Sequence, residues 1–269
     1  MWATLLYLAL AHYPIARTNH LNLEMRDMEI PTRLIESLQS AKRVTVLTGA
    51  GISAESGVPT FRDAQTGLWA RYRPEELAMP EAFRRNPKLV WEWYARRRER
   101  VAQANPNAGH LALVEMEKRM PRFKLITQNV DGLHRGAGSQ NVIELHGNIM
   151  RTKCFREGMV IETWDDTGET PPRCPRCGGP LRPDVVWFGE ALPADALRAA
   201  IEASQSCDVF FSIGTSGVVK PAASLPYEAL RHGAIVVEVN PDETPLSPRA
   251  TFVLRGLAGR VLPVLVRAT

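Results

Sequence analysis

The sequence predicts an α/β protein built on a doubly wound, Rossmann-like and mostly parallel sheet, with a second, smaller domain attached. Short β-branched runs alternate with longer helical patterns over most of the chain, which is typical of parallel strands covered on both faces. The 269 residues, of which 45% are hydrophobic and 23% charged, suffice for a sizeable core. Stretches at 61–107 and 151–183 break the alternation and therefore indicate insertions.

The elements follow one another in a regular order. A helical pattern at 31–41 precedes the first β-branched run at 44–48. Helical patterns at 88–104 and 110–119 then lead to strands at 124–127, 142–145 and 185–188. The rest of the chain predicts a helix at 194–206, a strand at 209–213, a helix at 222–232, and strands at 235–239 and 261–266.

These elements divide the chain into parts. A Rossmann-like domain takes residues 28–60, 121–150 and 184–269, a helical insertion takes 61–120, and a small lobe rich in Pro, Gly and Cys takes 151–183. We expect the insertions to make the smaller domain together, with ligands in the cleft beside the sheet.

Composition excludes several protein classes. Disordered, collagen-like and disulfide-framework proteins do not have this balance of residues. A net charge of +4 permits an acidic partner such as a nucleotide without demanding nucleic acid. Four cysteines are too few for a disulfide scaffold, so a reducing compartment, the cytoplasm, is expected.

The status of residues 1–27 stays open. The apolar run at 2–11 is shorter than the roughly 20 residues that span a bilayer, and no Lys or Arg precedes it as in a signal peptide. These residues are either an N-terminal extension, or translation begins at Met25 or Met28. We expect no membrane attachment.

A glycine motif follows the first predicted strand. Gly49, Ala50, Gly51 and Ser53 belong to a G-x-G-x-x-A sequence, in which glycines let the backbone approach a pyrophosphate. An NAD dehydrogenase would carry an acidic ribose ligand about 20 residues further on. The sequence there, residues 69–74, is Trp-Ala-Arg-Tyr-Arg-Pro, which disfavours hydride transfer.

The longer stretch 49–62, GAGISAESGVPTFR, resembles the sirtuins, which are NAD-dependent protein lysine deacylases. Further motifs agree with this resemblance in the right order: TQNVDGLH at 127–134, ELHG at 144–147, VWFGE at 186–190, GTS at 214–216 and VN at 239–240. The resemblance covers about residues 31–267. It implies the products nicotinamide, O-acyl-ADP-ribose and free lysine.

The resemblance assigns His146 as the catalytic residue. Loss of nicotinamide leaves an electron-poor ribose carbon, which the acyl-lysine oxygen captures in the sirtuin reaction, and a ribose hydroxyl then loses its proton to a base. An imidazole titrates at about 6.5 and suits this task. A lone histidine at a strand end is more often structural, but the Glu-Leu-His-Gly context favours catalysis.

The resemblance also assigns the NAD site. Asn129 and Asp131 would hold the nicotinamide end and Gln128 the ribose, at the carboxyl end of a predicted strand. The remaining predicted NAD contacts are Phe61 and Arg62 over the reacting ribose, and Gly214, Thr215, Ser216 and Asn240 around phosphate and adenosine.

Substrate binding is predicted in two places. Peptide main chain is expected to add itself to the strand-like segment Val186, Trp187, Phe188, Gly189 and Glu190, although the same residues fit a buried strand.

Tyr94 and Arg97 lie three residues apart on one helix face, where a phenol and a guanidinium can grip a carboxylate. This arrangement, with the small residue Ala64, resembles class III sirtuins, which remove succinyl, malonyl and glutaryl groups. The alternative is that Arg97 belongs to a solvated run of arginines.

A metal site is predicted in the small lobe. Cys154, Cys174 and Cys177 match positions at which sirtuins carry a four-cysteine structural zinc, in a zinc-ribbon-like lobe. Glu157 stands at the fourth position. A carboxylate can ligate zinc, so one zinc per chain is expected, with loss of the metal as the alternative.

Taken together, the sequence predicts a cytoplasmic class III sirtuin that acts as a monomer on acylated protein lysines and binds neither nucleic acid nor membranes. Three alternatives stay open: an enzyme that mainly removes acetyl groups, a protein ADP-ribosyltransferase, and a zinc-ribbon module that binds nucleic acid.

Overall fold

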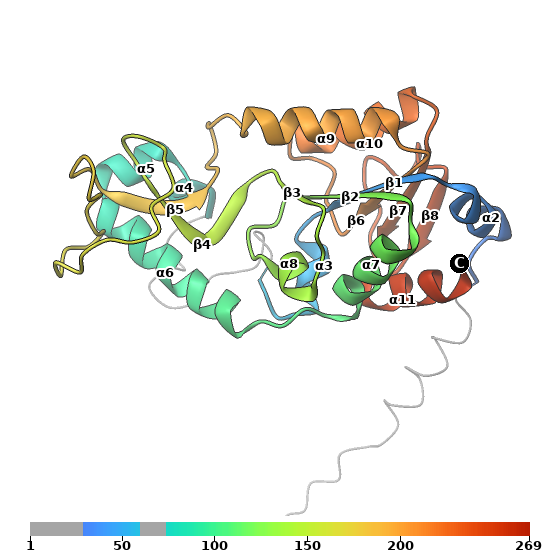
Figure 1. Cartoon of the computed structure of the whole chain (residues 1–269), viewed down its shortest axis with the longest axis horizontal. Coiled ribbons are helices and arrows are strands. Elements are labelled where there is room, and N and C mark those ends of the chain that lie inside the picture. The colour runs from blue at the N-terminus through green and yellow to red at the C-terminus, as the bar shows by residue number, and fades with distance from the viewer. Residues whose placement is uncertain (1–28, 60–73) are drawn as a thin grey trace, which may run out of the picture.

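The computed structural model describes residues 29–59 and 74–269. A six-stranded parallel sheet crosses the larger part of the molecule (Figure 1), with the strand order β3-β2-β1-β6-β7-β8. This order confirms the predicted doubly wound fold, because the chain builds outward from β1 first to one edge and then to the other. The strands are β1 (Arg43–Thr48), β2 (Arg122–Thr127), β3 (Val142–Glu144), β6 (Val209–Ile213), β7 (Ile235–Asn240) and β8 (Phe252–Arg255).

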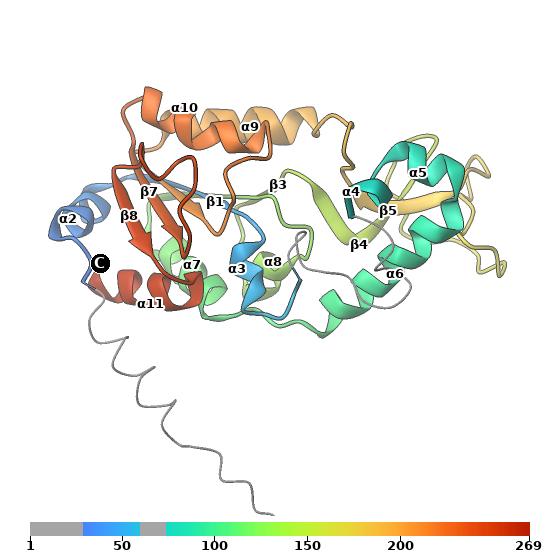
Figure 2. The ribbon, with the colours of Figure 1, turned by 180° about the vertical axis from the view of Figure 1, so that it is seen from behind.

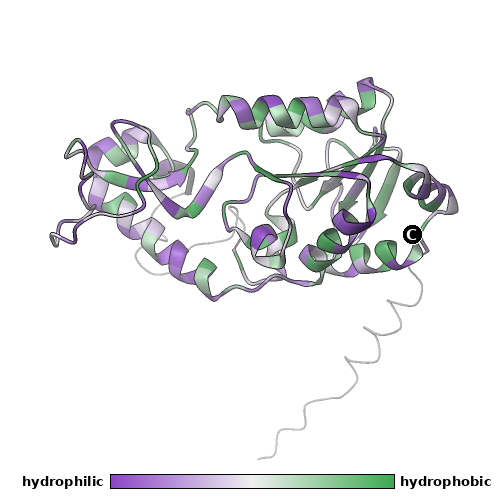
Figure 3. Cartoon of the chain, viewed as in Figure 1, coloured by the Kyte–Doolittle hydropathy of each residue, from purple (hydrophilic) through white to green (hydrophobic). Residues whose placement is uncertain are grey.

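Helices cover both faces of this sheet (Figures 1 and 2). One face packs against α2 (Thr32–Ser40), α7 (Ala108–Arg119) and α11 (Ala258–Ala268). The other packs against α9 (Ala194–Ser206), the short η2 (Ala222–Ser224) and α10 (Leu225–Arg231). The strands between these layers are mainly hydrophobic, whereas the helices mix hydrophobic and hydrophilic residues (Figure 3). The core therefore consists of two apolar layers, one on each side of the sheet.

The strand predicted at 261–266 is wrong. Residues 261–266 form the middle of α11, not a strand. Their β-branched composition suggested a strand, but the buried positions recur at helical spacing: Ala258, Val261, Leu262, Leu265 and Val266. The neighbouring strand β8 was not predicted.

The smaller part of the molecule combines helices with an antiparallel pair. The helices are α4 (Pro74–Leu77), α5 (Pro80–Arg85) and α6 (Pro87–Gln103), and the strands are β4 (Gly147–Cys154) and β5 (Leu181–Val185). The strand predicted at 185–188 is therefore also wrong, because β5 ends at Val185. Trp187 turns into an apolar cluster with α5 and α6 instead of continuing the strand.

Two short helices, α3 (Gly51–Ala54) and α8 (Leu133–Ala137), follow the first two strands of the large sheet and lie next to the site described below. Within residues 29–59 and 74–269, every helix is too short or too polar to cross a lipid bilayer.

Candidate active site

A cavity of about 1120 Å³ lies at the carboxyl ends of the central strands. The turns after β1, β2, β6 and β7 line one side of it, and α6 with residues 185–190 line the other. Strand β1 lies between β2 and β6, where the strand order reverses. Open α/β sheets bind ligands at such a switch point, and this volume is at the upper end of the range for ligand pockets.

The glycine-rich turn after β1 interlocks with the turn after β6. A β-carbon on Gly51 would lie 2.7 Å from the carbonyl oxygen of Gly214, and one on Gly49 would lie 2.8 Å from the same oxygen. That oxygen accepts a hydrogen bond from the N–H of Gly51 at 2.8 Å. The glycines therefore allow two turns to touch, and both turns, with Ala50, line the cavity.

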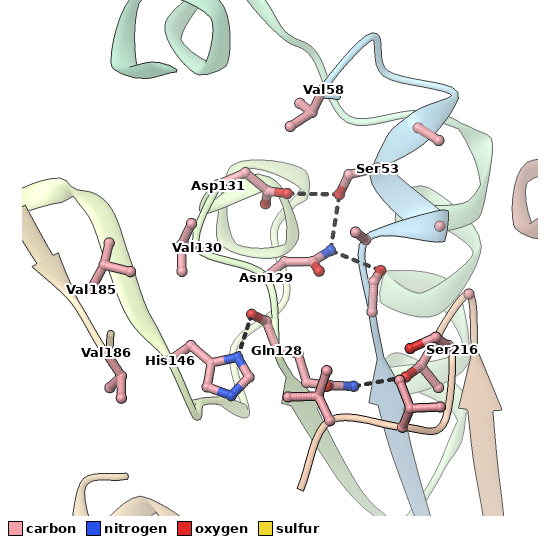
Figure 4. Close-up of a pocket in the computed structure, with 18 of the residues that line it drawn as sticks. Ser53, Val58, Gln128, Asn129, Val130, Asp131, His146, Val185, Val186 and Ser216 are labelled. Atoms are coloured by element: carbon pink, nitrogen blue, oxygen red, sulfur yellow. Dashed lines mark hydrogen bonds between the residues drawn. The ribbon is translucent and has the colours of Figure 1, made fainter. Parts of the chain in front are cut away.

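A buried polar network connects the first two turns (Figure 4). The side-chain nitrogen Nδ2 of Asn129 donates to the carbonyl of Gly49 and to Oγ of Ser53, both at 3.0 Å. Ser53 in turn donates to Asp131 at 2.7 Å, and the N–H of Leu133 donates to the other carboxylate oxygen at 2.9 Å. Burial raises the pKa of Asp131, and these two bonds oppose the rise.

Polar side chains from three strands meet beside this network. Gln128 donates from Nε2 to the Thr215 hydroxyl at 3.0 Å, and Asn240 donates from Nδ2 to the Thr215 carbonyl at 2.9 Å. Ser216 borders the same region of the cavity (Figure 4). The predicted NAD residues thus come together from the ends of β2, β6 and β7, with amide and hydroxyl groups that suit ribose and phosphate.

The imidazole of His146 faces the cavity beside Gln128 (Figure 4). Its Nδ1 lies 2.9 Å from the Gln128 carbonyl oxygen. Because a carbonyl only accepts, Nδ1 carries the proton, and Nε2 of the neutral ring keeps its lone pair. Burial lowers the pKa of His146 and the bond to Gln128 partly opposes this, so the ring is neutral at pH 7.

The next residue, Gly147, fixes the backbone at this point. It has φ +81°, and a β-carbon there would lie 2.2 Å from the carbonyl oxygen of Asp184 on β5. Only glycine therefore lets β4 begin against β5 directly after His146.

Tyr94 and Arg97 both line the cavity from α6. The Tyr94 hydroxyl accepts a hydrogen bond from Nε1 of Trp187 at 2.9 Å. Burial raises the pKa of Tyr94 to about 12, so the phenol keeps its proton. The Arg97 guanidinium lies 5.0 Å from the ring centroid of Trp93, which holds it beside the cavity. Arg97 is therefore separate from the exposed side chains of Arg96 and Arg100.

The segment after β5 borders the same cavity. The N–H of Val186 donates to the carbonyl of His146 at 2.9 Å, so this backbone is tied to the histidine. Trp187 is buried and Phe188 is 43% exposed. Glu190 accepts a hydrogen bond from the N–H of Trp187 at 2.8 Å, across the turn that Gly189 makes with φ +84°.

A cluster of three thiols and one carboxylate lies in the small lobe. One ligand atom each from Cys154, Glu157, Cys174 and Cys177 lies within 4.8 Å of the other three. The Sγ atoms of Cys154 and Cys177 are 3.4 Å apart. Ligands that share a zinc ion at roughly 2.3 Å lie about this far from one another, so the residues fit the metal.

Three predicted site residues, Phe61, Arg62 and Ala64, lie outside the described residues. Other parts of the site gave no sequence signal. Thr48 and Thr127, buried at the ends of β1 and β2, share a hydrogen bond of 2.9 Å, and Thr48 is 2.9 Å from Nε2 of His134. Thr127 also accepts a hydrogen bond from the backbone N–H of Asn129, which connects these residues to the polar network. Threonines at the ends of strands are too common for the sequence alone to identify these two.

Comparisons with known proteins agree on one family. A model described as the Sir2 family matches residues 49–221. An NAD-dependent protein deacylase of Aquifex aeolicus (strain VF5) is 59% identical over 205 residues, which cover 76% of this chain and 85% of the relative. A crystal structure of a Sir2 homolog–NAD complex has a TM-score of 0.82 and 48% identity, covering 89% of this chain and 93% of that one. A Sir2 homologue in complex with 2′-O-acetyl ADP ribose has a TM-score of 0.81 and 49% identity, covering 88% and 96%.

Proposed function

The chain belongs to the Sir2 family, and we propose that this NAD-dependent protein deacylase removes succinyl and malonyl groups from lysine as well as acetyl groups. The observation that carries the acyl class is the pair Tyr94 and Arg97, which line one side of the cavity that also contains His146.

The cavity residues have distinct tasks in this reaction. When bound, NAD supplies the ribose carbon to which the acyl oxygen bonds as nicotinamide leaves. Asn129, Asp131 and Ser53 form a buried network at the expected nicotinamide end and exclude water there. His146, neutral and with Nδ1 fixed by Gln128, accepts a ribose hydroxyl proton at Nε2. Thr215, Ser216 and Asn240 hold the adenosine end.

An acid acyl group suits the wall made by α6. The carboxylate of a succinyl or malonyl chain would accept a hydrogen bond from the Tyr94 hydroxyl and pair with the Arg97 guanidinium. The high pKa of Tyr94 supports this role, because an ionised phenol would repel the carboxylate. An acetyl group has no carboxylate to make either contact, so its turnover depends on them less.

We also propose that the cluster of Cys154, Glu157, Cys174 and Cys177 holds one structural zinc ion. The metal would join the two ends of the stretch 154–177, which otherwise has a small apolar core. The cytoplasmic location, the monomeric state, the two-domain division and the lack of nucleic-acid binding stay predictions.

The experiment that tests the acyl class compares three versions of one peptide, with succinyl-, malonyl- and acetyl-lysine, in the presence and absence of NAD. We expect a strict NAD requirement and a higher kcat/KM for the two acid forms. A preference for acetyl-lysine would support the alternative of a deacetylase. Mass spectrometry of the reaction products distinguishes an ADP-ribosyltransferase, which would leave ADP-ribose on a protein.

A further inference from the structure

Trp187 is held rigidly in the wall of the cavity. Its side chain is 2% exposed, and the guanidinium of Arg182 stacks on its ring at 3.2 Å from the ring centroid. Arg182 is itself 3% exposed and forms hydrogen bonds of 2.5 and 3.0 Å with the two carboxylate oxygens of Glu190. The same carboxylate accepts the backbone N–H of Trp187 at 2.8 Å. Both the ring and the backbone of Trp187 are therefore fixed by one ion pair, in which Arg182 is buried and Glu190 is 24% exposed.

The fixed indole determines how the Tyr94 hydroxyl is oriented. Nε1–H of an indole is a donor only, so the phenol oxygen acts as the acceptor in the 2.9 Å bond between the two residues. The hydroxyl proton then cannot point toward Trp187. Tyr94 lies in one apolar cluster with Trp93 and Trp187 and also borders the cavity, where the carboxylate of an acyl group would accept this proton.

We propose that Trp187 is a positioning residue for acid-acyl selectivity: its Nε1–H orients the Tyr94 hydroxyl so that the phenol donates to the carboxylate of the acyl group. The inference rests on the proposed acyl class and adds the residue that prepares the site before substrate binds. Because the Tyr94 hydroxyl has one orientation before the acyl group binds, less conformational entropy is lost on binding. It matters for succinyl-lysine and far less for acetyl-lysine, which does not reach the phenol.

The test is a double-mutant cycle with Trp187→Phe and Tyr94→Phe. Phenylalanine at 187 keeps an aromatic ring for Arg182 and removes the N–H. We expect W187F to lower the ratio of succinyl to acetyl kcat/KM by about fivefold, the worth of one hydrogen bond. In the Y94F background, W187F is expected to leave that ratio unchanged, because the hydroxyl it orients is already gone.

A matched control removes packing without removing the N–H. Phe83 is fully buried with its ring centroid 5.3 Å from that of Trp187. Phe83→Leu is expected to lower the melting temperature and to keep the succinyl-to-acetyl ratio of the parent.

The outcomes separate the two proposals. If Y94F has the same ratio as the parent, the phenol does not recognise the carboxylate and the positioning role fails, whereas the acid-acyl class fails if the parent itself prefers acetyl-lysine. If Y94F lowers the ratio but W187F lowers it equally in both backgrounds, or not at all in the parent, only the positioning role fails.

If W187F does not fold, NMR of ¹⁵N-tryptophan-labelled protein gives the answer in the parent and in Y94F. We expect the Trp187 indole N–H resonance to shift with Y94F, and to shift when succinyl-lysine peptide is added to the parent but not to Y94F. If the Trp187 indole resonance shifts neither with Y94F nor with added succinyl-lysine peptide, the inference is overturned.

Discussion

The carbonyl oxygen of Gln128 accepts a hydrogen bond from Nδ1 of His146, and the two residues belong to turns that follow different strands of the molecule. The bond selects one tautomer of the ring and leaves the lone pair of Nε2 free for the proton transfer proposed above. The same Gln128 binds Thr215 through its side chain, so one residue positions both the proposed base and the proposed adenosine side of the site.

The deacylation rate is expected to fall in acid. Burial places the pKa of His146 below 6.5, and only the neutral ring has a lone pair at Nε2. The rate should therefore be level near pH 7 and decline as the pH falls through a value below 6.5. His146→Ala should lower kcat about 100-fold or more. A pH series of nicotinamide release in both proteins checks this, and an alanine variant as fast as the parent would contradict the assignment.

Stability is also expected to fall in acid, for a different reason. Burial lowers the pKa of His110 to about 4 and, together with His110, that of His134 to about 3. The unfolded chain binds protons at these residues near pH 6.5, so between pH 6.5 and 4 it binds more protons than the native state. The free energy of unfolding should drop by up to about 1.4 kcal/mol per pH unit for each ring.

Urea unfolding at pH 7.5, 6 and 5 measures this slope. His134→Gln should make the slope of unfolding free energy against pH shallower. The same change at the exposed His232 serves as the control and should leave the slope of the parent unchanged. An equal slope in the parent and in the His134 variant would contradict the prediction.

Arg97→Met is expected to lower kcat/KM for succinyl-lysine by roughly 10- to 100-fold, since it removes a charged partner of the acyl carboxylate. Acetyl-lysine should be affected much less. Arg100→Met, on the exposed side of the same helix, serves as the control and should leave both values near those of the parent. Equal losses for the two peptides would instead indicate damage to the fold.

Metal binding is expected to depend on Glu157. Purified protein should contain about one zinc per chain, and Glu157→Ala should lose zinc faster to a chelator. Glu157→Cys should retain zinc longer than the parent, because a thiolate is a softer ligand than a carboxylate. Zinc release followed with a colorimetric chelator measures all three proteins. A zinc-free parent whose melting temperature is unchanged by Cys174→Ser would exclude a structural metal.

Gly147→Ala is expected to destabilise the protein by roughly 3 kcal/mol or more, because the new methyl group would collide with the Asp184 carbonyl. Gly158→Ala provides the control, since Gly158 has a similar φ of +72° with open space around it. Its cost should be about 1 kcal/mol, the price of the conformation alone. Equal unfolding midpoints in urea for the two variants would show that β4 and β5 can move apart.

The sequence predicted the sheet well where a strand is a short buried run between helices, as at β1, β6 and β7. It misled at 261–266, where β-branched residues occupy the buried side of a helix. The apolar residues of α11 recur at helical spacing, and this spacing distinguishes the helix where β-branched composition does not.

The sequence predicted residues that the fold brings to the cavity where a motif follows a strand, as with Asn129 and Thr215. The residue that holds the Tyr94 hydroxyl could not be predicted in this way. This residue, Trp187, lies 93 positions further along the chain, and the Arg182–Glu190 pair that fixes Trp187 has no local pattern. Such contacts depend on how two separate segments fold against each other, and periodicity carries no information about that.

The contact between Gly51 and Gly214 limits how the enzyme can be redesigned. A library that randomises the glycine loop to change the preferred dinucleotide would alter these positions. Here a side chain at Gly51 or Gly214 would push apart the turns that follow β1 and β6. Most clones would therefore misfold before their cofactor preference could be assayed. Randomisation at Ser216 would alter the same end of the pocket and spare the contact.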